Sequence, residues 1–297
     1  MNNKQISRLT GRKVESADKV NRVVTDSRRA RNIIVILAII AALQMISFGI
    51  IIPIFPRRLG DFGGGVEALG LMAMAYSITS IAAAPFMGSL ADRYGRRPLL
   101  LGSLAAYVLA FTGYLLATST ESFIVIRALA GVLTAGLGPA TMGIVSDIAP
   151  ENERARWIGI VGGGSSVGWI IGPPLGGLLY DKWGYAAPFI VSVAMAAIAL
   201  IAAFVMVQET RTGEVRQSEK RQRIRPLRKG PATAQPISIR NSLPRPLPTF
   251  AVLLSISFIM IFAWTFAEPK LMFYIYDDLG WTSARFGLAM SGYGVAS

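Results

Sequence analysis

The sequence contains no cysteine and no histidine among its 297 residues. Without cysteine there is no disulfide or thiolate metal site, and without histidine the commonest neutral-pH acid–base group and metal ligand is missing. Charged residues make up only 16% of the chain, whereas 53% are hydrophobic and the mean hydropathy is +0.49. We therefore expect no metal, no cofactor and no enzyme, in a chain too apolar for an ordinary soluble domain.

The apolar residues fall into long blocks, and about 20 such residues let a helix cross the hydrocarbon core of a bilayer. Seven blocks and the beginning of an eighth are present, at about 33–55, 66–91, 98–118, 121–147, 156–179, 185–207, 250–275 and from 284 onward. The pattern predicts an all-α, multi-pass protein of the inner or plasma membrane. No cleavable signal peptide is expected, because the first block is long enough to remain as a span.

The formal net charge is +13, and 24 of the 30 lysine and arginine residues lie in four segments between or before the blocks. These segments are the N-terminal tail, the second connection, the fourth connection and the loop 208–249. By the positive-inside rule, they and the N-terminus are cytoplasmic. Because the basic residues separate apolar blocks instead of covering a soluble face, we expect a lipid bilayer and no nucleic acid as partner.

Composition divides the chain into four parts. Residues 1–32 form a basic cytoplasmic tail, 33–207 a six-helix transmembrane bundle, 208–249 a basic, proline-rich linker, and 250–297 the start of a second bundle. The linker cannot bury enough apolar area to order itself, and is either a solvated loop or a site for anionic lipid. Because the sequence stops inside the eighth block, we expect a fragment or truncated form of a longer protein.

The connection after the second block, 88–98, reads GSLADRYGRRP. A glycine there permits close helix approach, the carboxylate can meet an arginine or a helix N-terminus, and the later glycine allows a tight turn. It resembles the G-x-x-x-D-R-x-G-R-R/K pattern of the major facilitator superfamily, which implies a cytoplasmic gate. A basic turn that only fixes topology is the alternative. The gate residues are Gly88, Asp92, Arg93, Gly95, Arg96 and Arg97.

An acidic and basic segment, DIAPENERAR, begins at Asp147 near the end of the fourth block. Similar segments occur at this place in the superfamily. The resemblance implies that Asp147 pairs with Arg96 or Arg97 and belongs to the same gate.

In the fifth block, residues 168–177 read GWIIGPPLGG. The glycines form a small face for close packing, and a proline inside the helix leaves a carbonyl unpaired and bends it. The string resembles the G-x-x-x-G-P-x-x-G-G motif of drug/proton antiporters, and we expect a dry, pliable seam between the two bundles. Ordinary glycine packing is the alternative. The motif residues are Gly168, Gly172, Pro173, Gly176 and Gly177.

Arg127 and Glu268 are the charged residues inside apolar blocks that suggest a function, because a charge is costly there. Arg127 begins an R-x-x-x-G string similar to a superfamily motif, which implies a role in proton coupling or in the electrostatics of a cavity. Its alternative is an arginine that extends to the membrane interface. A proton-driven antiporter needs a carboxylate that loads and releases a proton, and Glu268 is the one candidate within a block. The alternative is that Glu268 is a carboxylate at the membrane interface with no part in coupling.

The first block carries Gln44 and Ser47, polar residues that can face a substrate cavity, and it ends in a string, 49–56, similar to that of twelve-span drug antiporters. The alternative interpretation of this string is structural: Pro53 and Pro56 simply end the helix. Methionine and aromatic residues of several blocks can line a cavity for amphipathic drugs or face lipid. They include Met45, Trp169, Trp264 and Phe266.

The resemblance as a whole implies the major facilitator fold, in which two six-helix bundles rock about a midplane substrate site. It further implies a monomer that exports small amphipathic molecules, driven by a proton gradient and needing no cofactor. Two alternatives stay open. One is a transporter of a metabolite, such as a sugar or organic anion, from the same superfamily; the other is a truncated membrane protein that transports nothing.

Overall fold

The computed structural model describes residues 30–209 and 247–296, and the regular structure in these ranges is helical. Seven helices are long and apolar enough to cross a membrane. They span Ala30–Asp61, Val66–Tyr94, Arg96–Leu116, Thr120–Ile148, Arg154–Trp183, Ala186–Met206 and Pro248–Asp278. The predicted multi-pass helical architecture is confirmed. Nearly all of the expected tail and most of the expected linker lie outside the described residues.

Three of the spans are divided into shorter elements. The first consists of a helix over residues 30–51, the 3₁₀ turn η1 (Ile52–Ile54) and α2 (Phe55–Asp61), and the fourth of α5 (Thr120–Thr134) and α6 (Leu137–Ile148). The seventh consists of α11 (Leu247–Phe273) and the π-helical turn η2 (Tyr274–Asp278). The other elements are α3 (Val66–Tyr94), α4 (Arg96–Leu116), α7 (Arg154–Trp183), α8 (Ala186–Met206) and α12 (Ser283–Ala296).

The first span continues through both of its prolines. Pro53 and Pro56 each stand in the first two positions of a helical segment, η1 and α2, where the missing N–H group has no intrahelical partner to lose. The chain therefore stays helical to Asp61. The alternative that these prolines simply end the helix is wrong.

Local signals place the ends of the neighbouring spans. Gly95 has φ +110°, a value that L side chains rarely adopt, and its N–H donates to the Ala91 carbonyl to close the turn between α3 and α4. Ser119 and Ser122 form a capping box in which each side chain accepts from the other's backbone N–H. That box fixes the start of the fourth span.

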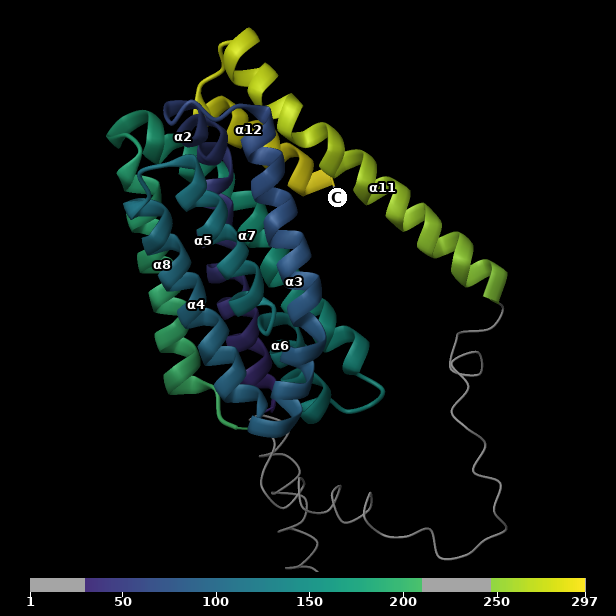
Figure 1. The fold of residues 1–297 in the computed structure, drawn as a ribbon. Coiled ribbons are helices and arrows are strands. Elements are labelled where there is room, and N and C mark those ends of the chain that lie inside the picture. Colours follow the sequence, from purple (N-terminus) through teal and green to yellow (C-terminus); the bar gives the residue numbers. More distant parts are fainter. Residues whose placement is uncertain (1–29, 210–246, 297) are drawn as a thin grey trace, which may run out of the picture.

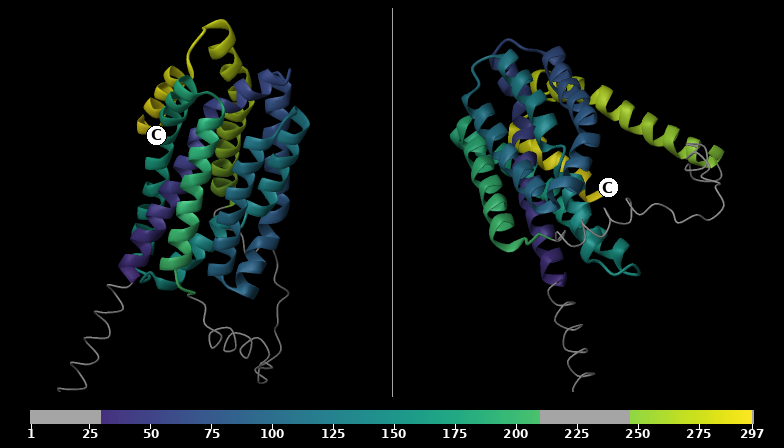
Figure 2. Two further views of the ribbon diagram at one scale, coloured as in Figure 1. Left: turned by 90° about the vertical axis from the view of Figure 1, so that its left-hand side faces the viewer. Right: turned by 60° about the horizontal axis from the view of Figure 1, so that its bottom comes forward.

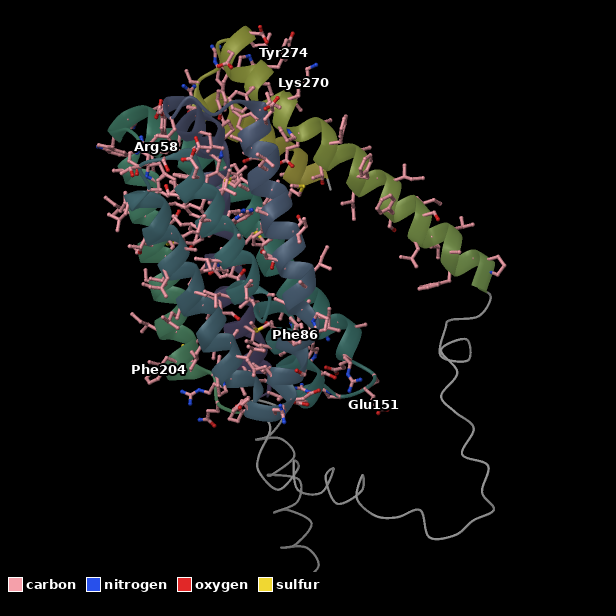
Figure 3. All side chains as sticks on the ribbon, viewed as in Figure 1. Arg58, Phe86, Glu151, Phe204, Lys270 and Tyr274 are labelled. Atoms are coloured by element: carbon pink, nitrogen blue, oxygen red, sulfur yellow. The ribbon has the colours of Figure 1, made fainter. Side chains whose placement is uncertain are left out.

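The first six spans stand side by side in one bundle, whereas α11 meets this bundle at one end only (Figures 1 and 2). After η2 the chain turns back, and α12 packs mainly along α7. Arg58 and Tyr274 lie at the end where α11 joins, and Phe204 and Glu151 at the opposite end (Figure 3). We call these the Arg57 end and the Arg96 end, after the arginines discussed below.

Buried side chains form two groups, one toward each end. The group at the Arg57 end is rich in aromatic rings, among them Phe111, Tyr114 and Phe123. The outward faces of the helices are also apolar: Ile81 and Phe86 are each 74% exposed. Such broad exposed apolar surface is foreign to soluble monomers, and a bilayer is the medium that covers it.

Candidate functional site

An ion pair holds the α3–α4 hairpin at the Arg96 end. Arg96 Nη1 lies 2.8 Å from Asp147 Oδ2, and the two side chains are only 16% and 29% exposed. One helical turn before Asp147, a Cβ atom on Gly143 would lie 2.7 Å from Arg96 Cδ, so the glycine makes room for the arginine. Of the two partners that the sequence allowed for Asp147, the structure selects Arg96.

Arg97 turns to α8 instead. Its Nη2 donates to the Phe204 carbonyl at 2.6 Å, and its guanidinium lies over the Phe204 ring. The Glu209 carboxylate accepts from the backbone N–H groups of Arg96 at 3.2 Å and Arg97 at 3.3 Å. Glu209 thus caps α4, whose Gly95 cap has no side chain. Sequence reasoning missed this residue, whose signal was a lone carboxylate two residues after the sixth block.

The other hairpin residues behave differently from one another. Gly95 makes the tight turn that was expected. Asp92 and Arg93 are exposed in the last turn of α3. The close helix approach expected at Gly88 is wrong for the part of the chain described, because a Cβ atom there would meet nothing within 4 Å.

A row of glycines on α7 packs against the first span. Gly168, Gly172 and Gly176 all face its backbone. A Cβ atom on Gly172 would lie 2.8 Å from Gly49 Cα, and one on Gly176 would lie 1.9 Å from the Ile50 carbonyl oxygen. This row brings two helices of the same bundle together, so the expectation that Gly168 and Gly172 lie in the seam between the bundles is wrong.

The contact with α12 uses the adjacent face of α7. A Cβ atom on Gly177 would lie 2.1 Å from the Ser283 carbonyl oxygen, and one on Gly287 would lie 2.4 Å from the Pro173 carbonyl oxygen. Pro173 lies inside α7, and Gly287 inside α12. The backbones of α7 and α12 are therefore in close contact, and Pro173 and Gly177 are the motif residues at this contact; a pliable seam between two bundles stays a prediction.

Polar contacts join the first span to η2 and the following loop at the Arg57 end. Arg57 Nη2 donates to the Trp281 carbonyl at 2.9 Å, and the guanidinium lies 4.4 Å from the centroid of the Tyr276 ring. The Tyr276 hydroxyl donates to the Pro53 carbonyl at 2.7 Å. Pro56, three residues further on, has no N–H group, so the Pro53 carbonyl lacks the donor that a 3₁₀ turn would bring to it.

Asp181, near the end of α7, holds the start of α12. Its Oδ1 accepts from the Ser283 N–H at 3.3 Å and its Oδ2 from the Ala284 N–H at 2.9 Å. A carboxylate at a helix N-terminus satisfies orphan donors and complements the helix dipole. We call these three interactions, made by Arg57, Tyr276 and Asp181, the closing contacts. They could not be predicted from the sequence, since nearly all of their partners are backbone groups distant along the chain.

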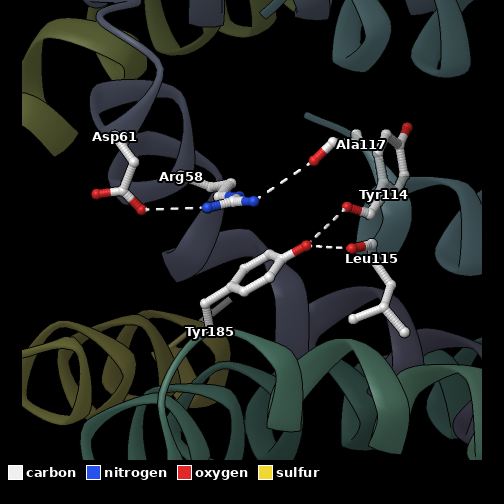
Figure 4. Close-up of polar contacts among 6 residues, drawn as sticks. All are labelled: Arg58, Asp61, Tyr114, Leu115, Ala117 and Tyr185. Atoms are coloured by element: carbon white, nitrogen blue, oxygen red, sulfur yellow. Dashed lines mark hydrogen bonds and ion pairs between the residues drawn. The ribbon is translucent and has the colours of Figure 1, made fainter. Parts of the chain in front are cut away.

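A second network of polar contacts at this end joins spans within the six-helix bundle (Figure 4). Arg58 Nη1 lies 3.7 Å from Asp61 Oδ2, and Arg58 Nη2 donates to the Ala117 carbonyl at 3.4 Å. The Tyr185 hydroxyl donates to the Leu115 carbonyl, and its ring lies under the Arg58 guanidinium. These contacts link the first, third and sixth spans, so that this end of the bundle can move as one unit.

Arg127 and Glu268 line one cavity of about 230 Å³, the Arg127 cavity, between the fourth and seventh spans. The Arg127 guanidinium lies 4.2 Å from the centroid of the Tyr76 ring and 5.2 Å from that of Phe48. Such contacts hold a cation inside an apolar bundle. The structure thus turns Arg127 inward. The remaining lining residues are Phe48, Ile52, Phe55, Leu69, Met72, Ala73, Trp169, Thr265, Pro269 and Met272.

Gln44 lines a second cavity, the Gln44 cavity, of about 330 Å³. Residues of the first five spans line it, and Phe48 borders both cavities. The Gln44 side chain is 5% exposed, and neither its amide oxygen nor its nitrogen has a hydrogen-bond partner among the described residues. The remaining lining residues are Leu37, Ile40, Ala41, Met45, Tyr76, Tyr107, Leu137, Gly138, Thr141, Met142, Val161 and Ser165.

The other expected cavity residues divide. Ser47 is fully buried and donates to the Leu43 carbonyl at 2.7 Å, so it serves the helix and not a cavity. Met45 and Trp169 line cavities, whereas Phe266 is 78% exposed. The Trp264 side chain lies outside the description. No group of three or more acidic, cysteine or histidine residues that could hold a metal occurs in residues 30–209 and 247–296.

A family model described as "Major Facilitator Superfamily" matches residues 37–297. Among curated relatives, the chain is 34% identical to the class H tetracycline resistance protein of Pasteurella multocida over 61% of this chain and 46% of the relative. It is 28% identical to the class G protein of Vibrio anguillarum over 89% and 64%. It is 30% identical to multidrug resistance protein 2 of Bacillus subtilis over 63% and 46%. The chain therefore spans roughly half to two thirds of these relatives' lengths.

Solved structures with a similar fold include a human organic anion transporter, with a TM-score of 0.66 and 20% identity over 90% of this chain and 70% of that one. A D-xylose–proton symporter has a TM-score of 0.61 and 17% identity over 88% and 65%. At these identities the likeness concerns the arrangement of the helices alone.

Proposed function

The chain belongs to the major facilitator superfamily, and from this premise we propose that it exports small amphipathic molecules in exchange for protons. The fold is that of a multi-pass membrane transporter, and relatives named for tetracycline and multidrug resistance support export. Transport by such folds alternates access to a midplane site as two bundles rock. The proposal concerns the complete protein and includes no catalytic step.

The observation that carries the proposal is that Arg127 and Glu268 line the same cavity. They come from the fourth span of one bundle and the first helix of the other. When Glu268 is ionised, its carboxylate attracts the Arg127 guanidinium across a medium of low polarity; when it is protonated, that attraction is lost. Loading a proton on Glu268 thus changes the force between the bundles, which is what coupling requires.

The two ends supply the gates of the cycle. By the distribution of lysine and arginine, the Arg96 end is cytoplasmic and the Arg57 end faces outward. The closing contacts then seal the outer side in this conformation, and α11 approaches the first bundle only there. Export requires the closing contacts to break, while the hairpin held by Arg96 and Asp147 takes part in closing the cytoplasmic side.

The test uses the complete protein in everted membrane vesicles, with a fluorescent probe of the pH gradient. Adding a transported amphipathic compound should release protons from the vesicles and partly dissipate the gradient. Glu268→Gln should abolish this response while leaving compound binding within about threefold, because the amide cannot carry the proton but keeps the side-chain shape. Tetracycline and a set of amphipathic dyes serve as the compounds.

Glu67→Gln is the matched control, because Glu67 is an exposed carboxylate in the first turn of α3. It should leave the response unchanged at equal membrane abundance. A full proton response from Glu268→Gln would remove that residue from coupling. Absence of any response to all compounds in the unaltered protein would instead favour a metabolite transporter or a protein that transports nothing.

A further inference from the structure

The Gln44 amide is a polar group that the protein leaves without a partner. Its side chain is 95% buried, it lines the Gln44 cavity, and neither of its polar atoms is hydrogen-bonded within the described residues. Leaving a buried amide unsatisfied costs about 1–3 kcal/mol, so native proteins rarely keep one without use for it. A glutamine side chain carries a carbonyl oxygen that accepts and an NH₂ group that donates. It can therefore bind a ligand that has a donor and an acceptor next to each other.

The surroundings of Gln44 are largely apolar and aromatic, with the hydroxyl groups of Tyr76, Tyr107, Thr141 and Ser165 as the other polar groups of the lining. Phe48, Tyr76 and Tyr107 supply flat ring surface, and Met45 and Met142 supply adaptable thioethers. No carboxylate is among the residues that line this cavity. A volume of about 330 Å³ lies in the range of pockets that hold small organic molecules.

A positive charge lies against the lining of this cavity. The Arg127 guanidinium lies over the rings of Phe48 and Tyr76, which are both lining residues of the Gln44 cavity. In a site of low polarity, this cation repels a positively charged ligand and attracts a negative one. Glu268, the one carboxylate nearby, lines the Arg127 cavity only.

We propose that the Gln44 cavity is the substrate-recognition site of the first bundle, and that it selects uncharged or anionic planar aromatic molecules over permanent cations. The Gln44 amide forms hydrogen bonds with a donor and an acceptor group at the edge of the bound molecule. The positive charge of Arg127 determines that this molecule is neutral or anionic. This inference rests on the proposed function, because it names the class of molecule that is exported.

Two dyes built on the same three-ring xanthene test the proposal: fluorescein, which is anionic at neutral pH, and rhodamine 123, which is a cation. Binding of each to the complete, purified protein is measured by fluorescence anisotropy in detergent at constant ionic strength, without any pH gradient. Fluorescein should bind at least about tenfold more tightly, as expected for one favourable charge interaction in a buried site.

Two substitutions locate the recognition. Gln44→Leu keeps the volume but removes the amide, and should weaken fluorescein binding about tenfold. Gln44→Glu differs by one group and adds a negative charge, and should reverse the preference toward rhodamine 123. Ser103→Ala is the matched control, because Ser103 is 1% exposed, has no partner for its hydroxyl among the described residues, and does not line the cavity. It should leave both affinities unchanged.

Equal binding of the two dyes, stronger binding of rhodamine 123, or no binding of either would overturn the proposal. Normal fluorescein binding by a Gln44→Leu protein that elutes as a folded, monodisperse species would also overturn the proposal. The Gln44 amide would then form hydrogen bonds with water and not with the ligand. The proposed function can fail separately. If the protein binds fluorescein through Gln44 but shows no exchange for protons in vesicles, the proposed proton coupling is refuted and the recognition site stands.

Discussion

Glycine residues on α7 differ in what an added methyl group would meet. At Gly176 the nearest atom is a carbonyl oxygen of the first span, which cannot move aside as a flexible side chain can. At Gly162 a Cβ atom would meet nothing within 4 Å. The same chemical change on the same helix should therefore have opposite effects at the two positions.

Gly176→Ala should lower the free energy of unfolding by about 1–3 kcal/mol, because the two helix backbones must separate to admit the methyl group. Gly162→Ala should be neutral or stabilise by up to ~1 kcal/mol, because alanine has the higher helix propensity. Thermal unfolding in detergent, followed by intrinsic tryptophan fluorescence, measures both. Equal melting temperatures for the two variants would refute the close approach at Gly176.

The residues of the candidate site differ in how far the sequence could predict them. Arg127 and Glu268 stood out because an ionisable residue inside an apolar block is rare and costly. Glu209 did not stand out, since a carboxylate beside a basic linker looks like any solvated residue. Its role depends on backbone N–H groups more than 100 positions away, and no local pattern reports those.

At the scale of elements, α7 packs on both the first span and α12. One face packs through glycines on the first span, the adjacent face packs on α12, and Asp181 near its end caps the start of α12. The rocking motion of the proposed function would therefore have to slide α12 along α7 or part the two helices. The polar part of this joint is the set of closing contacts, and the rest is close backbone packing.

Asp181→Ala should loosen the joint, because the start of α12 loses two hydrogen bonds and a favourable charge worth about 1 kcal/mol. Ser283→Cys provides a nearly isosteric buried thiol next to Asp181, on a chain with no other cysteine. Its modification by a maleimide in purified protein should become about five times faster when Asp181→Ala is added.

Asp277→Ala is the control for this experiment, because Asp277 is an exposed carboxylate of η2 at the same end. It should leave the rate of modification unchanged. If Asp277→Ala accelerates the reaction as much as Asp181→Ala does, the closing contact of Asp181 is not what holds α12.

The basic residues of the chain are divided unevenly among its connections, and the direction of the proposed export depends on which end of the bundle faces the cytoplasm. Arg96 and Arg97 lie at the Arg96 end, and in the sequence the basic tail precedes the first span while the basic loop 208–249 follows the sixth. By the positive-inside rule this asymmetry favours the proposed orientation, whereas the contacts between helices would be the same in either orientation.

The absence of cysteine makes the orientation directly testable with single introduced thiols. Gly65→Cys places one at the Arg57 end, where a Cβ atom would meet nothing within 4 Å, and Glu151→Cys places one at the exposed loop of the Arg96 end. A membrane-impermeant maleimide added to intact cells should label the first only, and both after permeabilisation. Labelling of Glu151→Cys alone in intact cells would invert the proposed topology and with it the direction of export.

The sequence by itself determined the number and approximate limits of the spans, because the cost of placing polar groups in hydrocarbon acts residue by residue along the chain. It also marked the hairpin, the glycine-rich span and the two embedded charges. Only the tertiary structure decided which helix each glycine faces, that Arg96 and not Arg97 pairs with Asp147, and that Arg127 and Glu268 share a cavity. Those choices depend on how helices distant in sequence pack together, and hydropathy carries no record of that.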